Sequence, residues 1–311
     1  MSPSDTSTGD WTRNPEELGA KYFGSPPAPV CVDFGALSHP GKVRANNEDH
    51  YAVVRRRRSR EVLLTNLPAA SLPPLREDAY TLTVADGMGG HACGEVASMM
   101  ALHLSWELTG SAFKWHFKLT AEEAAELTEQ FRVYGQVIHR KLQELGQAES
   151  RLAGMGTTLT AVLTAGLDAL VAHVGDSRAY LFRAGALEQL TRDHTLAQQL
   201  VDRGALPSVA SATGFMRSVL TNCLGGTYPD VKVKTYPLRL ADGDRLLLCT
   251  DGLTDMLSAE EIRGVLAHHS DPQVACGALV DRALDHGGKD NVTVVLARYV
   301  AAPPLPEPAR H

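Results

Sequence analysis

The stretch that decides the fold covers residues 157–183, TTLTAVLTAGLDALVAHVGDSRAYLFR. Short apolar runs over 157–164, 169–174 and 178–183 are separated by turn residues at 166–168 and 175–176. Runs of this length, bounded by glycine and aspartate, predict β-strands. Three strands therefore follow one another here with no helix between them.

On both sides of this block the sequence predicts a pair of helices and further strands. Apolar residues at helical spacing after Gly94 predict a helix through Leu108, and a second helix is predicted over 122–145. Further strands are predicted over 30–34, 51–54, 80–84, 231–238, 245–249 and 292–300, and a second helix pair over 258–268 and 272–286. Strands, a helix pair, strands, a helix pair and a last strand indicate two sheets covered by helices, unlike the regular alternation of a doubly wound fold.

The remaining segments define the domain. Residues 1–29 and 301–311 are rich in proline and small polar residues and predict flexible tails, which leaves one domain over 30–300. Residues 193–226 fit neither period and predict an excursion, or flap, that carries Arg203 and Arg217. The run Arg55–Arg60 is predicted to lie in a hairpin loop, with docking of an acidic or phosphorylated protein segment as the other interpretation. Met99 and Trp106 are expected in the core.

Composition excludes several classes of protein. The chain has 311 residues, 44% hydrophobic and 21% charged, with a net charge of -6, which is typical of a globular protein and argues against nucleic acid as a partner. No apolar run approaches the roughly 20 residues of a membrane span, and no signal peptide is evident, so a cytoplasmic location without a membrane partner is expected. Five scattered cysteines without a CxxC pair argue against a disulfide framework or a zinc site.

The informative carboxylates are aspartates next to glycine or asparagine at the ends of predicted strands: Asp86, Asp176, Asp251 and Asp290. One such aspartate is usually only part of a turn. Four of them predict converging carboxylates, which repel one another unless cations neutralise them. Oxygen ligands favour Mg²⁺ or Mn²⁺, and Gly87 would let a backbone carbonyl approach an ion. A site with two such ions suits hydrolytic attack on phosphorus.

A basic group near such a site could orient a phosphate. Arg44 stands four residues before Glu48 and Asp49. Either Arg44 forms a salt bridge within a surface loop, or it binds phosphate while Glu48 and Asp49 hold waters of the metal ions.

Seven short motifs follow one another across residues 30–300. They are RANNED (44–49), VADGMGGH (84–91), GTT (156–158), HVGDSR (173–178), LTNCLGG (220–226), TDGL (250–253) and DNVT (290–293). In this order they resemble the motifs of the type 2C (PPM-type) metal-dependent serine/threonine protein phosphatases in their bacterial form.

The resemblance implies a role for each matching residue. Asp86 resembles the aspartate that bridges two ions, Gly87 the residue that offers its carbonyl, and Asp251 and Asp290 the ligands of the other ion. Glu48 and Asp49 resemble groups that act through water. Asp176 resembles the ligand of a third ion, shared with Asp251, and Asp255 resembles an additional ligand. Arg44 resembles the arginine that binds phosphate. His91 is a candidate general acid, since Met88 stands where animal members have a histidine.

The implied fold is a four-layer αββα sandwich, with two antiparallel sheets flanked by helix pairs. The implied reaction is hydrolysis of phosphoserine and phosphothreonine in proteins by a water that bridges two Mn²⁺ or Mg²⁺ ions, without a phosphoenzyme. The expected partners are phosphoproteins, among them substrates of a bacterial-type serine/threonine kinase, and the chain is expected to be a monomer. Two alternatives stay open: a pseudophosphatase that binds phosphoproteins without turnover, and a metal-dependent phosphodiesterase or nuclease.

Overall fold

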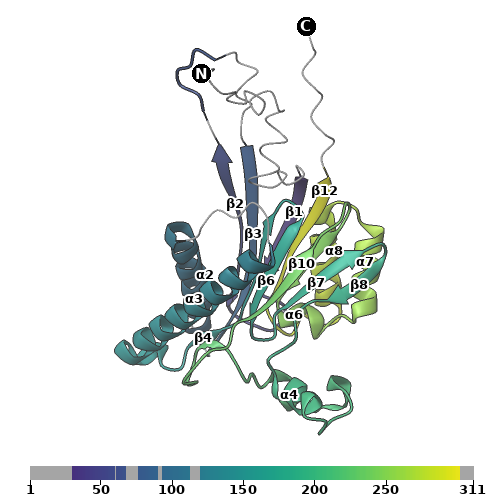
Figure 1. Cartoon of the computed structure of the whole chain (residues 1–311). Coiled ribbons are helices and arrows are strands. Elements are labelled where there is room, and N and C mark those ends of the chain that lie inside the picture. Colours follow the sequence, from purple (N-terminus) through teal and green to yellow (C-terminus); the bar gives the residue numbers. More distant parts are fainter. Residues whose placement is uncertain (1–29, 60, 68–75, 90–92, 113–119, 302–311) are drawn as a thin grey trace, which may run out of the picture.

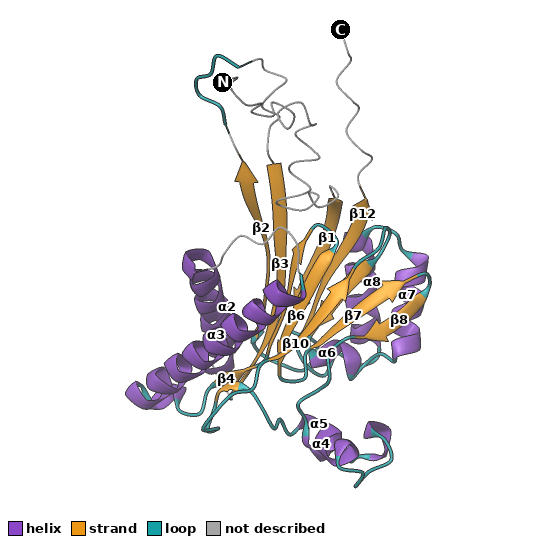
Figure 2. Ribbon diagram, in the orientation of Figure 1, coloured by secondary structure: helices purple, strands orange, loops and turns teal. Residues whose placement is uncertain are grey.

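The computed structural model describes residues 30–59, 61–67, 76–89, 93–112 and 120–301. Two antiparallel sheets face each other, and a helix pair covers the outer face of each (Figures 1 and 2). The expected four-layer αββα sandwich is therefore confirmed. No helix in the described ranges is both long and apolar enough to span a membrane.

The first sheet has seven strands in the order β10-β6-β5-β3-β4-β9, with β2 paired to the other side of β3. Its strands are β2 (Asp49–Ser59), β3 (Arg76–Met88), β4 (Gly156–Thr157), β5 (Leu159–Ala165), β6 (Asp168–Val174), β9 (Leu224–Gly225) and β10 (Lys234–Arg239). The helices α2 (Cys93–Ala112) and α3 (Ala121–Ala148) cover its outer face (Figure 1).

The second sheet has five strands in the order β1-β12-β11-β7-β8. Its strands are β1 (Val30–His39), β7 (Arg178–Arg183), β8 (Ala186–Gln189), β11 (Arg245–Cys249) and β12 (Val292–Ala301). The short α6 (Asp251–Thr254) and the helices α7 (Ala259–His268) and α8 (Pro272–Asp285) pack on it. Between β8 and β9, the predicted flap contains α4 (Leu196–Asp202) and α5 (Gly214–Ser218), which lie outside the sandwich (Figure 2).

The block at 157–183 does not stay within one sheet. Strand β6 belongs to the first sheet and β7 to the second, so the chain crosses between the sheets over the three residues Gly175–Ser177. Gly175 has a φ of +107°, which favours glycine, and a β-carbon there would lie 2.5 Å from the Thr158 side chain. The crossing places Asp176 at the end of both sheets.

Alternation along the strands builds two cores. Leu246, Leu248 and Val295 point between the sheets, where they meet Leu82 and Val84 of the first sheet. The intervening residues of the same strands point outward and pack under α7 and α8, and they include Leu247, Val294 and Leu296. Both sets are fully buried, as the period of two in a central strand requires.

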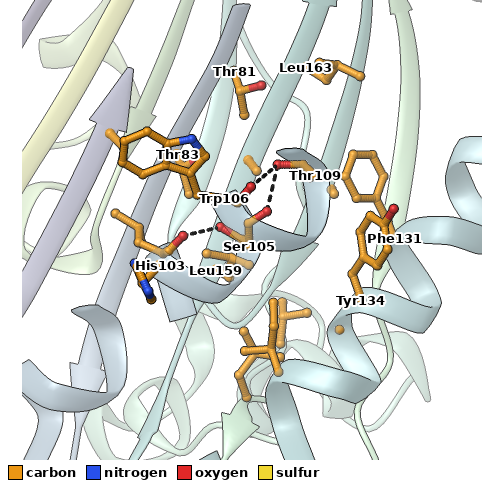
Figure 3. Close-up of a pocket in the computed structure, with 18 of the residues that line it drawn as sticks. Thr81, Thr83, His103, Ser105, Trp106, Thr109, Phe131, Tyr134, Leu159 and Leu163 are labelled. Carbon is orange, nitrogen blue, oxygen red and sulfur yellow. Dashed lines mark hydrogen bonds between the residues drawn. The ribbon is translucent and has the colours of Figure 1, made fainter. Parts of the chain in front are cut away.

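Two predictions about exposed features were wrong. Arg55–Arg58 lie in β2, not in a loop, because β2 and β3 stay paired as far as Ser59 and Arg76, and Arg57 makes two hydrogen bonds of 2.7 and 3.0 Å to Asp78. Met99 and Trp106 are 47% and 61% exposed, because the sheet beside α2 presents small side chains such as Ala161 and leaves a hollow that both residues line (Figure 3).

Candidate metal and phosphate site

The site begins where β2 and β3 meet. Asp49, the first residue of β2, lies directly opposite Asp86 near the end of β3. Two threonines fix the Asp86 backbone: its N–H donates to Thr158 Oγ1 (2.9 Å), and its carbonyl accepts from Thr157 Oγ1 (2.8 Å) and Thr158 N–H (2.9 Å). These hydrogen bonds fix both the N–H and the carbonyl of Asp86, so its backbone position does not depend on a bound ligand.

The second sheet supplies the other carboxylates to the same end of the sandwich. Asp251 follows β11 and Asp290 precedes β12, and these strands are neighbours. Thr250 connects the sheets, because its hydroxyl donates to Asp49 Oδ2 at 2.8 Å and accepts from the N–H of Thr293 at 3.0 Å. With Asp176 at the crossing from β6 to β7, aspartates from both sheets converge.

This convergence shifts the pKa of each buried aspartate upward. Burial raises the pKa of Asp86 well above its usual value, and the charges of Asp49, Asp251 and Asp176 raise it further. Burial is also the largest cause of the raised pKa values of Asp49, Asp251 and Asp176. The ionised cluster is unfavourable without a cation.

Arg44, the arginine that the sequence predicted beside the site, contacts the cluster. Arg44 Nη2 donates to Asp290 Oδ2 at 2.6 Å, and this hydrogen bond raises the pKa of Arg44. The Arg44 side chain remains 56% exposed. Arg44 thus forms a salt bridge with Asp290, which lies 246 residues away in the chain. A salt bridge within the surface loop 44–49, one of the two interpretations of the sequence, is not what the structure shows.

The donor groups fit hard divalent cations. They are carboxylate oxygens, and the buried Asp49 Oδ1 has no hydrogen-bond partner. Among the described residues, no three carboxylate, imidazole or thiol groups stand so that they could jointly hold one ion as they are now oriented. Two of the candidate oxygens are engaged elsewhere, Asp290 Oδ2 by Arg44 and Asp49 Oδ2 by Thr250.

The remaining residues predicted for the site are Glu48, Asp255 and His91. Glu48 is close to Arg44 and to Gly94, where a β-carbon would lie 2.3 Å from Glu48 Oε2. Asp255 is near Asp251, raises its pKa and is itself partly desolvated. His91 lies outside the described residues.

One residue that holds the site together was not singled out from the sequence. Asn291 accepts a hydrogen bond from Glu48 N–H (2.8 Å) and donates to the carbonyls of Asn46 (2.8 Å) and Pro40 (2.9 Å). It therefore fastens the loop that carries Arg44 to the start of β12. The signal was present in the Asp290-Asn291 pair, but only the fold shows what the amide contacts.

The glycines after the aspartates are required by packing of the backbone. A β-carbon at Gly87 would lie 2.0 Å from the carbonyl oxygen of Gly94, and one at Gly252 would lie 1.9 Å from that of Asn291. Real β-carbons do not approach backbone atoms so closely. Each Asp-Gly pair thus brings its aspartate close to another segment of the site.

We expect Gly252→Ala to lower the free energy of unfolding by about 3 kcal/mol, because the Asn291 carbonyl would have to move. Gly264→Ala, in the middle of α7 with open space around it, is the matched control and should stabilise the protein by up to about 1 kcal/mol. Urea unfolding measures both. Equal effects at the two positions would contradict the steric account of Gly252.

Comparison with known proteins shows which family the chain resembles over most of its length. The family model of protein phosphatase 2C matches residues 75–281. The serine/threonine protein phosphatase PstP of Mycobacterium tuberculosis is 38% identical over 278 residues, which is 87% of this chain but only 46% of PstP. The chain thus spans about half the length of that relative.

Two further comparisons cover their counterparts almost completely. The serine/threonine phosphatase stp of Listeria welshimeri is 32% identical over 259 residues, with 82% of this chain and 91% of the relative aligned. The crystal structure of the PstP catalytic domain in complex with two manganese ions superposes with a TM-score of 0.64 at 34% identity, covering 88% of this chain and 100% of that one. The likeness therefore includes the whole catalytic domain of a manganese-binding phosphatase.

Proposed function

Because the chain belongs to the protein phosphatase 2C family, we propose that it hydrolyses phosphoserine and phosphothreonine in proteins with two Mn²⁺ or Mg²⁺ ions and no phosphoenzyme intermediate. The observation that carries this proposal is the convergence of Asp49, Asp86, Asp176 and Asp251 at one end of the sandwich, where loss of hydration and mutual repulsion raise the pKa of each. Such a cluster is suited to neutralisation by divalent cations.

We assign the ion-binding role to this cluster, by analogy with the manganese-bound catalytic domain. Asp86 would serve both ions, with the Gly87 carbonyl on one side and Asp251 and Asp290 on the other. Asp176, with Asp251, would hold a third ion, Asp255 would be a further ligand, and Glu48 and Asp49 would act through water. When bound, the ions would supply the activated water that attacks phosphorus and would neutralise the phosphoryl oxygens.

The residues of the chain would orient the substrate. The exposed guanidinium of Arg44 lies at the edge of the carboxylate cluster, where it can donate two hydrogen bonds to phosphoryl oxygens. Asn291 fastens the Arg44 loop and so limits the movement of this group. His91 remains the candidate for protonating the leaving serine or threonine oxygen.

The partners follow from the same assignment. We infer that the substrates are phosphoproteins, including those of a bacterial-type serine/threonine kinase, and that the phosphatase works as a monomer. The pseudophosphatase alternative is disfavoured because every core carboxylate, Asp86, Asp251 and Asp290, is present. The diesterase alternative has no supporting feature in the described surface.

The test is phosphate release from a phosphothreonine peptide. Turnover is expected with 1 mM Mn²⁺, and excess EDTA should reduce it to background because the carboxylates alone cannot activate water. A pseudophosphatase would bind the peptide and release no phosphate. Faster cleavage of a phosphate diester than of the peptide would favour the diesterase, and turnover that survives EDTA would exclude metal-dependent chemistry.

A further inference from the structure

The flap that contains α4 and α5 lies outside the sandwich, so its position depends on the contacts at its base (Figure 2). The two segments of the base run side by side. Leu196 N–H donates to the carbonyl of Val219 at 2.8 Å, and Thr221 N–H donates to the carbonyl of His194 at 2.8 Å. An antiparallel β-bridge lies between these two bonds. The base is therefore closed by backbone pairing, and His194 stands at its entrance.

His194 also contacts the turn that carries Asp176. Its backbone N–H donates to the carbonyl of Gly175 at 2.7 Å, and its Nδ1 accepts from the N–H of Gly175 at 3.0 Å. The same Nδ1 lies 3.0 Å from the amide nitrogen of Asn222, at the exit of the flap. One imidazole nitrogen thus joins the entrance of the flap, its exit and the residue directly before Asp176.

These hydrogen bonds determine which form of the His194 ring fits here. A backbone N–H can only donate, so Nδ1 must carry a lone pair and the neutral ring has its proton on Nε2. Burial lowers the pKa of His194 to about 4, which keeps the ring neutral near pH 7. The amide of Asn222 is fixed by Lys232, whose N–H donates to its Oδ1 at 3.0 Å and whose carbonyl accepts from its nitrogen at 2.8 Å. The second hydrogen of that nitrogen is thus left for His194 Nδ1.

The same turn is bonded to the centre of the carboxylate cluster on its other side. Ser177 Oγ lies 2.8 Å from Thr158 Oγ1, and Thr158 Oγ1 accepts the N–H of Asp86 at 2.9 Å. Asp176 therefore stands between one neighbour that is connected to Asp86 and another that is connected to the flap.

A salt bridge attaches the flap to the sandwich without the help of the imidazole. Arg178, the first residue of β7, donates to the carboxylate of Asp193 at 2.7, 3.0 and 3.1 Å. Charge-assisted bonds of this kind are among the stronger contacts in proteins. We therefore expect the flap to stay attached, and the chain to fold, when the side chain of His194 is replaced.

We propose that His194 is a positioning residue of the phosphatase site, which holds the Gly175–Asp176 turn against the base of the flap. An ion at Asp176 and the closed base of the flap then stabilise one another, because both require the same position of this turn. The role of Asp176 as an ion ligand rests on the proposed function, whereas the contacts of His194 do not.

The variants His194→Leu and His194→Asn separate this role from simple packing. Leucine is of similar size and has no acceptor, whereas the Oδ1 of asparagine can take the place of Nδ1. In the metal-free protein, we expect His194→Leu to speed amide hydrogen exchange over residues 194–222 by about tenfold or more, because the Gly175 N–H loses its acceptor. His194→Asn should keep the exchange rates close to those of the unmodified protein.

Isothermal titration with Mn²⁺ measures the effect on the ions. The binding step that depends on Asp176 is identified by its loss in Asp176→Asn. We expect His194→Leu to weaken this step by about tenfold, and His194→Asn to restore it. In the unmodified protein Mn²⁺ should also slow hydrogen exchange over 194–222, and this slowing should be lost in Asp176→Asn.

Arg192→Gln is the matched control. It breaks the exposed salt bridge between Arg192 and Asp202 at the base of the flap and leaves the contacts of the Gly175–Asp176 turn in place. Both the Mn²⁺ titration and the response of hydrogen exchange to Mn²⁺ should therefore be unchanged.

Several results would overturn the proposal. One is unchanged exchange and unchanged Mn²⁺ affinity in His194→Leu, and another is an equal loss in both His194 variants, which would mean that the ring only fills space. Should His194→Leu fail to fold, slowing by Mn²⁺ that persists in Asp176→Asn would refute the coupling. Phosphate release from the peptide without any response of the flap to Mn²⁺ would refute the role of His194 alone. Absence of any Mn²⁺ binding would refute the proposed function as well.

Discussion

Asp86→Asn should lower kcat/KM for a phosphothreonine peptide by about a thousandfold or more, because the amide removes the charge at the centre of the cluster. The same substitution should stabilise the metal-free protein. Asp86 is partly buried beside Asp49, Asp251 and Asp176, whose charges repel it. A raised pKa in the folded state means that stability is lost as the pH rises above the unfolded value near 4.

At pH 8 in EDTA we therefore expect Asp86→Asn to raise the free energy of unfolding by about 1 to 3 kcal/mol. Urea unfolding measures this, and the peptide assay measures the loss of activity. Asp271→Asn is the matched control: Asp271 is the N-cap of α8, where asparagine serves equally well, so both quantities should stay unchanged. A variant that lost activity and stability together would indicate misfolding and would argue against electrostatic repulsion in the cluster.

Mn²⁺ at 1 mM should raise the Tm of the protein by roughly 5 to 10 °C. A ligand at 100 times its Kd stabilises the folded state by about 2.7 kcal/mol, and a domain of this size gains a few degrees per kcal/mol. The physical cause is relief of the repulsion among Asp49, Asp86 and Asp251. Thermal unfolding with Mn²⁺ and with EDTA measures the difference.

The control for the manganese effect is Asp86→Asn, which should lose most of the rise in Tm because the central carboxylate is neutral. Asp271→Asn should keep the full rise. If both variants responded to Mn²⁺ as the unmodified protein does, the ion would be acting at another place and the assignment of the cluster would fail.

Much of the fold could be predicted from the chain because its signals are local. The short apolar runs at 159–165 and 168–174 and the helical spacing after Gly94 depend only on neighbouring residues. The Asp-Gly pairs at 86–87 and 251–252 could be recognised for the same reason. Arg55–Arg58 were placed in a loop because four charged residues carry no strand signal, and pairing with β3 is a contact between distant segments.

The features that could not be predicted depend on contacts between segments that are distant in the sequence. The exposure of Trp106 follows from how α2 sits on a sheet face of alanine and threonine, a property of two layers that no single helix pattern records. The side chain of Asn291 donates hydrogen bonds to Pro40 and Asn46, which lie about 250 residues away in the chain. Its role in fixing the Arg44 loop could therefore not be predicted from the sequence.

By itself the sequence determined most of the longer strands, the helix pairs and the positions of the aspartates at strand ends, because these follow from local apolar patterns and turn chemistry within a few residues. Only the tertiary structure decided that the 157–183 block crosses between the sheets at Gly175, and that Asp49, Asp86, Asp176 and Asp251 lie close enough to repel one another. The physical reason is that charge repulsion and desolvation depend on distances in space, and those distances exist only after the two sheets have packed.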